Sequence, residues 1–150
     1  MNVVWKYFSF SELSITLLYD ILALRQAVFI VEQNSIYLDA DGHYDYSALH
    51  FCGFDEVGVL IAYTRIIPPK EKYEEPAIGR VVVATSARKK GIGYELMKRS
   101  IEKCNKLYPE HSIRISAQCY LEQFYSNLGF CSVGQPYLED DIPHIEMLRQ

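Results

Sequence analysis

The sequence predicts an α/β fold in which helices pack on a mixed β-sheet. Segments with the period of a strand alternate with segments of helical period, in the order β-α-β-β-β-α-β-α-β-β. The chain has 150 residues, 49% apolar and 23% charged, so it can bury a core as one domain over 1–150. No apolar run approaches the ~18 residues of a membrane span, so we expect no membrane partner.

The N-terminal third predicts a strand, a helix and a loop. The stretch from Val3 to Phe10 alternates weakly, as a strand does. Ser14 can cap a helix whose apolar side chains share one face, namely Leu17, Ile21, Leu24 and Val28. The polar and aromatic segment from Asn34 to Ala48 is rich in turn residues and predicts a loop.

Three strands and a long helix should follow. The segments Phe51 to Phe54 and Val57 to Ile67 predict a hairpin, and Ile78 to Val83 has the composition of a buried strand. The stretch Gly91 to Tyr108 predicts a helix with one apolar face, which ends before Pro109.

The last third predicts two kinds of short element. A strand should cover Ile113 to Ala117, and a short helix should cover Tyr120 to Leu128, where Gly129 can form a left-handed cap. Two short strands should close the chain, near Cys131 to Val133 and Ile145 to Leu148.

Charge is unevenly distributed along the chain. Residues 80–106 carry eight basic and two acidic side chains, a net +6, while the rest carries seven basic and 17 acidic, a net −10; the sum is −4. The basic segment suits an anionic ligand, and the acidic remainder could attract a cation. We expect no nucleic-acid partner, because the basic segment is narrow and the whole chain is acidic.

The cysteines and histidines show no metal-ligand pattern. The four cysteines form no C-x-x-C pair, so we expect reduced thiols, a cytoplasmic location and no metal. Asp39-x-Asp41-Gly42 invites comparison with a calcium loop, but the EF-hand spacing is not met. Asx-turn capping is the alternative explanation for these aspartates.

The sharpest chemical signal is a strand, a basic glycine-bearing turn and a helix in succession. The strand ends in Val81, Val82 and Val83, and the turn comprises Arg88, Lys89, Lys90, Gly91, Ile92 and Gly93. Free N–H groups at a helix N-terminus bind anions, and glycines let a phosphate approach the backbone. Neither the three-glycine Rossmann fingerprint nor the P-loop pattern is present, and a plain strand-to-helix turn stays the alternative.

Two motifs, in order and well separated, resemble those of the GNAT family of N-acetyltransferases. Arg88-x-x-Gly91-x-Gly93 is similar to the family's acyl-CoA motif, (Q/R)-x-x-G-x-(G/A). Downstream, Phe124-Tyr125-x-x-x-Gly129-Phe130 looks like its second motif. The resemblance implies a mixed, mostly antiparallel central sheet with flanking helices.

The resemblance extends over nearly the whole chain, toward the ElaA-like branch of the family. The matching stretches are R-x-x-V-F-x-V-E-Q from Arg25, Y-x-D-x-D-G from Tyr37, A-Y-x-R from Ala62, G-R-V-V-V from Gly79, A-Q from Ala117 and I-P-H-I-x-M from Ile142. Where these relatives tend to have E-D-G before I-P-H, this chain has E-D-D at 139–141, so the turn there departs from the pattern.

The family pattern implies an acetyl-CoA cosubstrate and a role for each matching position. The strand at Val81 to Val83 would meet the pantetheine arm and the acetyl carbonyl, and the turn at Arg88 to Gly93 would hold the pyrophosphate. Gln118 stands where many relatives have a cofactor-contacting asparagine. Tyr125 would be the general acid for the departing thiolate, and a packed core aromatic is its alternative role.

The acceptor side is indicated mainly by charge. Glu32, Asp39 and Asp41 lie in or beside the first loop, where the family usually builds its acceptor site. We expect them, with His144, to bind a cationic amine, and Glu32 to act as the base. His50 and His144 could relay a proton, or each could be a hydrogen-bonded structural residue.

Together these features predict direct transfer of an acetyl group from acetyl-CoA to an amine. The acceptor would be a small cationic amine or an amine of a peptide or protein. An acetyl-CoA sensor that has lost its acceptor site is the alternative function. The sequence leaves open whether the chain forms a homodimer.

Overall fold

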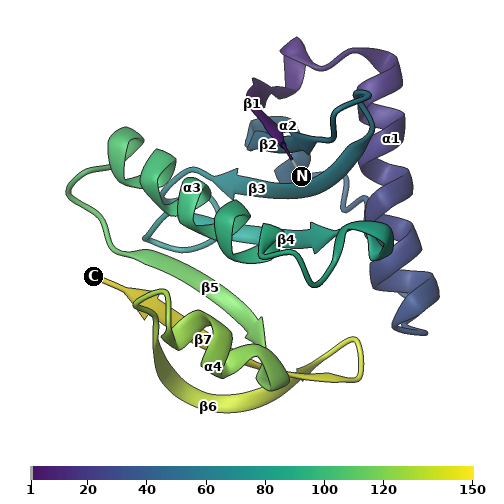
Figure 1. Cartoon of the computed structure of the whole chain (residues 1–150). Helices are drawn as coiled ribbons and strands as arrows, with labels where there is room; N and C mark the ends of the chain where they lie inside the picture. The colour runs from purple at the N-terminus through teal and green to yellow at the C-terminus, as the bar shows by residue number, and fades with distance from the viewer. Residues whose placement is uncertain (1) are drawn as a thin grey trace.

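The computed structural model describes residues 2–150, which form a mixed α/β fold around a seven-stranded sheet (Figure 1). The sheet order is β1-β2-β3-β4-β5-β7-β6, and neighbours are antiparallel except β4 and β5. The predicted fold class is therefore confirmed. The strands are β1 (Val4–Ser9), β2 (Leu49–Phe54), β3 (Leu60–Ile67), β4 (Ala77–Val83), β5 (Ile113–Gln118), β6 (Cys131–Glu139) and β7 (Ile142–Arg149).

Helices cover both faces of the sheet. They are α1 (Ile15–Arg25), α2 (Tyr44–Ser47), α3 (Ile92–Leu107) and α4 (Glu122–Ser126), with 3-10 turns η1 (Phe10–Glu12), η3 (Thr85–Ala87) and η4 (Cys119–Leu121). Tyr63 of β3 clusters with Ile21 of α1, whereas the adjacent Ala62 clusters with Leu96 of α3. Because successive strand side chains point to opposite faces, α1 and α3 enclose β3 between them. No helix within residues 2–150 is long and apolar enough to cross a bilayer.

The strands β4 and β5 diverge along the sheet (Figure 1), and residues of both strands line a cleft there. The two parallel strands are paired only at Ala77 and Arg114. A bulge in β4 contributes to the divergence: its pairing with β3 shifts between Tyr63 and Arg65, and Arg80 has a left-handed φ of 50°. Beyond the bulge, the edge of β4 that faces β5 keeps backbone groups free for a ligand.

Most predicted elements are confirmed with small shifts at their ends. Ser14 caps α1, because its Oγ accepts a hydrogen bond from the N–H of Leu17 at 3.0 Å. Two features of the N-terminal half were not predicted. The chain continues from α1 without a break into the π-helical segment η2 (Gln26–Glu32), and the loop over 34–48 contains α2.

The closing hairpin is much longer than the sequence predicted. β6 and β7 have nine and eight residues. Most of β6 is exposed, and Gly134 and Pro136 interrupt its pattern, so its alternation was hard to see. Asp140 and Asp141 have φ values of 51° and 63°, so the E-D-D sequence still makes a two-residue hairpin turn with two left-handed residues.

A buried ion cluster ties α1 and the loop over 34–48 to the sheet. Arg25 is fully buried; its Nε lies 2.7 Å from Asp39 Oδ2 and its Nη1 lies 2.8 Å from Asp45 Oδ1. Asp39 also pairs with Arg80 at 2.8 Å, and Asp45 pairs with Arg65 at 3.0 Å. Burial works against the charge of Arg25, but its contacts with Asp45 and Asp39 raise its pKa.

Replacing Arg25 should therefore destabilise the protein strongly. We expect Arg25→Met to lower the free energy of unfolding by about 3–5 kcal/mol, because two buried carboxylates lose their common partner. Arg99→Met is the matched control. Arg99 makes an exposed helical pair with Glu95 at 2.7 Å, so its loss should cost less than about 1 kcal/mol. Urea unfolding of both variants measures the difference; equal losses would contradict the prediction.

Candidate functional site

Among the described residues, two neighbouring cavities lie at the β4–β5 cleft and share a wall. The turn cavity, of about 480 Å³, extends toward the turn before α3. The loop cavity, of about 460 Å³, lies between the loop over 34–48 and the β6–β7 hairpin. Side chains from four segments line both cavities, and they are Phe29, Gln33, Val81, Gln118, Leu121 and Tyr125. A molecule that filled both cavities would pass these residues.

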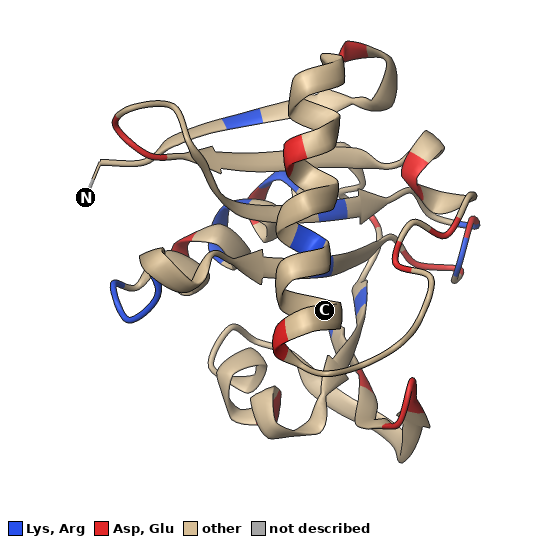
Figure 2. Cartoon of the chain, turned by 90° about the vertical axis from the view of Figure 1, so that its right-hand side faces the viewer, with Lys and Arg blue, Asp and Glu red and all other residues tan. Residues whose placement is uncertain are grey.

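The turn cavity ends at the N-terminus of α3, as the sequence predicted for an anion site. Gly91 is the N-cap with φ 76°, and Lys89 has φ 65°. No side chain caps α3, so the N–H groups of its first turn stay available to a ligand. Figure 2 shows the turn as a blue loop before the helix. The turn residues that line the cavity are Arg88, Lys89, Gly91, Ile92 and Gly93, whereas Lys90 does not.

Glu32 lies in the turn cavity, bound to Arg88. The Arg88 Nη2 group donates to Glu32 Oε1 at 2.7 Å, and Arg88 Nε donates to the carbonyl oxygen of Val83 at 3.2 Å. The hydrogen bond from Arg88 lowers the pKa of Glu32, which makes the carboxylate a weaker base. The structure therefore places Glu32 in the turn cavity and not in the loop cavity.

The three valines of β4 line the turn cavity, and Val81 reaches both cavities. Val82 and Val83 are paired with Tyr63 and Ala62 of β3. The opposite edge of β4 faces the cleft, since its pairing with β5 is confined to Ala77. This arrangement leaves an extended backbone edge at the position where the sequence predicted contact with a thioester arm.

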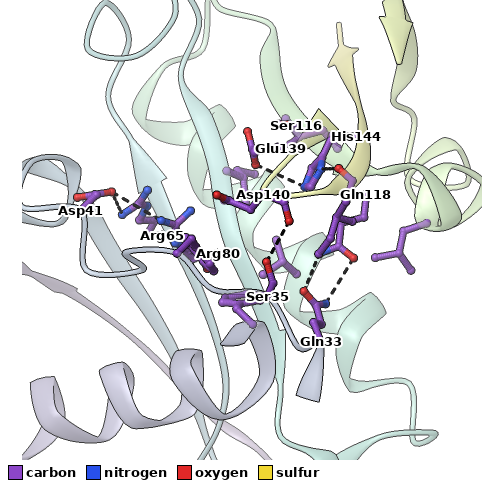
Figure 3. A pocket seen from close by; sticks show the side chains of 18 of the residues that line it. Gln33, Ser35, Asp41, Arg65, Arg80, Ser116, Gln118, Glu139, Asp140 and His144 are labelled. Carbon is purple, nitrogen blue, oxygen red and sulfur yellow. Dashed lines mark hydrogen bonds and ion pairs between the residues drawn. The ribbon is translucent and has the colours of Figure 1, made fainter. Parts of the chain in front are cut away.

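Gln118 is held by a residue that the sequence analysis did not select. Its Nε2 donates to Gln33 Oε1 at 3.2 Å, and Gln33 Nε2 lies 3.4 Å from Gln118 Oε1. Gln33 follows η2, and its N–H donates to the carbonyl of Val28 at 3.1 Å, a five-residue spacing typical of a π turn. The amide pair joins η2 to β5 at the junction of the two cavities (Figure 3).

Tyr125 is both a packed aromatic and a wall of both cavities. Its ring meets Phe124 and Phe130 edge to face, at centroid distances of 5.1 Å and 6.0 Å. Within residues 2–150 its hydroxyl makes no hydrogen bond, so it can donate to a ligand. Burial raises the pKa of Tyr125, which keeps the hydroxyl protonated at neutral pH.

His144 faces the loop cavity directly across the β5–β7 ladder from Gln118. Its Nδ1 lies 2.7 Å from the carbonyl oxygen of Ile142. A carbonyl only accepts, so Nδ1 carries the proton and Nε2 of the neutral ring is left as an acceptor. Nε2 lies 3.4 Å from Glu139 Oε2. Figure 3 shows this pair at the same end of the cavity as Gln118.

The other acidic and histidine candidates have structural partners. Asp39 is buried in the ion cluster and does not line the cavity. Asp41 lines it, but its Oδ1 accepts from the N–H groups of His43 and Tyr44 at 3.0 Å, the Asx-turn capping named as the alternative. His50 binds Tyr63 and the Asp45 carbonyl in the core, and burial lowers its pKa, so it stays neutral.

Sequence reasoning missed the cations of the loop cavity. Arg65, Lys72 and Arg80 line it, together with Glu139. Both arginines lie within stretches that match the family, A-Y-x-R and G-R-V-V-V. The match marked these positions as notable, but a single sequence does not show that β3 and β4 bring the two side chains together.

Comparison with known proteins decides the family. The model of the family described as "Acetyltransferase (GNAT) domain" matches residues 37–150. The chain belongs to the GNAT acetyltransferase family. Membership supports acyl transfer from an acyl-CoA cosubstrate, which fits the free amides and the cleft between β4 and β5.

Relatives match this GNAT protein over almost its full length. Protein ElaA of Escherichia coli K12 is 40% identical over 152 residues, covering 99% of this chain and 97% of ElaA. The crystal structure of E. coli ElaA has a TM-score of 0.91 at 38% identity, covering 99% of this chain and 100% of that one. An acyl-CoA N-acyltransferase from Pseudomonas aeruginosa has a TM-score of 0.93 at 36% identity, with the same coverage.

The anion site before α3 can be tested with a matched pair of glycine variants. Gly91 and Gly58 both have left-handed φ values, 76° and 90°, and neither would bring a Cβ within 4 Å of another atom. Gly91→Asp should weaken acetyl-CoA binding at least about tenfold, because a carboxylate would face the pyrophosphate. Gly58→Asp, in the β2–β3 turn, should leave binding unchanged. Calorimetric titration with equal affinity for both variants would contradict this placement.

Proposed function

We propose that the protein transfers an acetyl group from acetyl-CoA directly to the nitrogen of an amine. The observation that carries this proposal is the junction of two cavities at Val81, Gln118 and Tyr125. One cavity has unpaired helix N-terminal amides at its far end, and the other has His144. A cosubstrate in the first would present its thioester to an acceptor in the second. We place the reaction in the cytoplasm, where the four unpaired cysteines would stay reduced.

Acetyl-CoA would lie in the turn cavity. Its pyrophosphate would bind the N–H groups before α3, and Lys89 would add positive charge nearby. Its pantetheine arm would follow the free edge of β4, and the acetyl carbonyl would reach Val81. The backbone N–H groups of that edge would stabilise the tetrahedral oxyanion, a contribution of a few kcal/mol in enzymes that use backbone donors.

The reaction needs two proton movements, and two side chains are placed for them. The amine nitrogen attacks the carbonyl carbon, and His144 Nε2 takes the proton that the nitrogen loses. The tetrahedral intermediate then breaks its C–S bond and releases the CoA thiolate. Tyr125 donates a hydrogen bond to that thiolate. Its raised pKa makes full proton transfer unfavourable, so stabilisation of the thiolate is its main contribution.

Amine-dependent release of CoA and formation of the acetylated amine test the proposed function. The variant Tyr125→Phe tests whether Tyr125 is the donor to the departing thiolate. The variant keeps the ring and its packing, so acetyl-CoA affinity should stay within about twofold, while the single-turnover rate should fall about 10²-fold. Tyr19→Phe is the control, because Tyr19 is 74% exposed on α1, outside both cavities. A wild-type rate in Tyr125→Phe would show that Tyr125 has only a packing role. If no amine is acetylated, the alternative function of an acetyl-CoA sensor is favoured.

His144→Ala should lower the single-turnover rate by about 10²–10⁴-fold with little change in acetyl-CoA affinity. The truncation leaves space beside the acceptor, so added imidazole should restore part of the rate. His111→Ala, in the loop before β5, should behave as wild type with and without imidazole. A full rate in His144→Ala would assign proton removal to water or to another group.

A further inference from the structure

The loop cavity has a cationic end where the nearby carboxylates are already engaged. Asp39, Asp41 and Asp45 each accept hydrogen bonds at both carboxylate oxygens. Their partners are Arg25, Arg65, Arg80, Tyr37 and the N–H groups of His43 and Tyr44. Three carboxylates balance three arginines, so the acidic loop does not present the free negative charge that the sequence suggested.

Arg65 has N–H groups left over after these contacts. Its Nη1 lies 2.8 Å from Asp41 Oδ2 and 3.0 Å from Asp45 Oδ1, which uses both hydrogens of that nitrogen. Arg65 is 2% exposed, and its Nε is buried with no hydrogen-bond acceptor among the residues that the structure describes. A buried donor without an acceptor is costly. The Arg65 Nη2 group also makes no hydrogen bond within residues 2–150, and Arg65 lines the loop cavity, so an anion there would find a donor.

Arg80 and Lys72 extend this cationic end toward the opening. Arg80 Nε lies 2.8 Å from Asp39 Oδ1 as an ion pair but makes no hydrogen bond among the described residues, and its Nη2 donates to the Asp39 carbonyl oxygen at 3.1 Å. The Arg80 side chain is 20% exposed. The Lys72 ammonium lies 5.6 Å and 5.5 Å from the ring centroids of Tyr44 and Tyr73. It forms no ion pair within residues 2–150. Partial burial lowers the pKa of Lys72, the nearby Glu139 carboxylate acts in the opposite direction, and Arg65 and Arg80 lower the pKa further.

The opposite end of the same cavity carries His144, which lies beside Gln118 near the proposed thioester position. The Glu139 carboxylate is 3.4 Å from His144 and also close enough to Lys72 to act on its charge. Figure 3 shows Arg65 and Arg80 on one side of the cavity and His144, Glu139 and Gln118 on the other. The cavity is therefore bipolar, and its volume of about 460 Å³ suits a small molecule.

We propose that the acceptor is an amino acid or a close analogue, with a carboxylate and an amine in one small molecule. The carboxylate binds the free N–H groups of Arg65 and Arg80, with Lys72 at the rim, and the amine lies beside His144. Planar guanidinium groups match a carboxylate in geometry and in charge. This inference rests on the proposed acetyl transfer and specifies its substrate class.

Matched acceptors test the proposal. Straight-chain amino acids with one to six carbons between amine and carboxylate, and a set of α-amino acids, are compared with the alkylamines and methyl esters of the same length. At the best length, the amino acid should have a kcat/KM at least about tenfold above that of the counterparts without a carboxylate, because they lose the charged hydrogen bonds to the arginines. Equal or higher values for the alkylamines or diamines would overturn the proposal.

Variants connect the preference to these side chains. Lys72→Gln and Arg80→Gln should raise KM for the best amino acid about tenfold or more, and should lower the ratio of kcat/KM between amino acid and amine. Lys103→Gln is the control, since its ammonium also lies over a ring, 4.8 Å from Tyr7, but outside the cavity. A loss that is equal for both acceptor types would overturn the proposal. Lys72 lies on the exposed rim, so its variant should fold even if Arg80→Gln does not.

Direct binding separates this inference from the proposed function. Calorimetry with the same amino acids, in the presence of CoA, should show binding that weakens in Lys72→Gln. Such binding without any acetyl transfer would support the carboxylate site and refute the transferase. Transfer to amines without carboxylate-dependent binding would refute the site and support the transferase.

Discussion

One buried charge shapes the wall of the loop cavity. Arg25 ends α1 in the interior of the fold, where water cannot solvate its guanidinium. The carboxylates of Asp39 and Asp45 and the Asp39 carbonyl oxygen accept its hydrogen bonds, so the loop over 34–48 folds back against the sheet. The same two carboxylates then position Arg80 and Arg65 of the neighbouring strands. The wall of the loop cavity is therefore a consequence of burying Arg25.

The reaction centre depends on two local departures from regular structure. The bulge at Arg80 helps β4 to diverge from β5, which leaves a backbone edge of β4 unpaired beside the turn cavity. The π-helical η2 changes the spacing after α1, and the chain then presents Gln33 to Gln118 across the cleft. At each of the two places the backbone loses part of its regular hydrogen bonding, and in exchange a backbone edge or a side chain faces a cavity. Both lie within segments that have ordinary strand and helix composition.

The sequence predicted those features whose physics is local. The strand, basic turn and helix around Gly91, and the cap at Ser14, depend on a few adjacent residues, and the structure has them. It did not predict contacts between distant segments. Glu32 looked like an acceptor-side base, but Arg88, 56 positions later, holds it on the other side of the cleft. The closing strands were underestimated, because an exposed edge strand needs no apolar alternation.

Net charge is the clearest case in which composition and site diverge. Outside residues 80–106 the chain carries a net −10, which suggested a cationic acceptor. In the fold, the aspartates of the first loop are each engaged by arginines or backbone amides, so their field at the cavity is small. The groups available to a ligand in the cavity are the N–H donors of Arg65 and Arg80 that have no acceptor among the described residues. Since a ligand responds to unpaired groups within a few ångströms, recognition follows the residual hydrogen-bonding capacity of a site more closely than its summed charge.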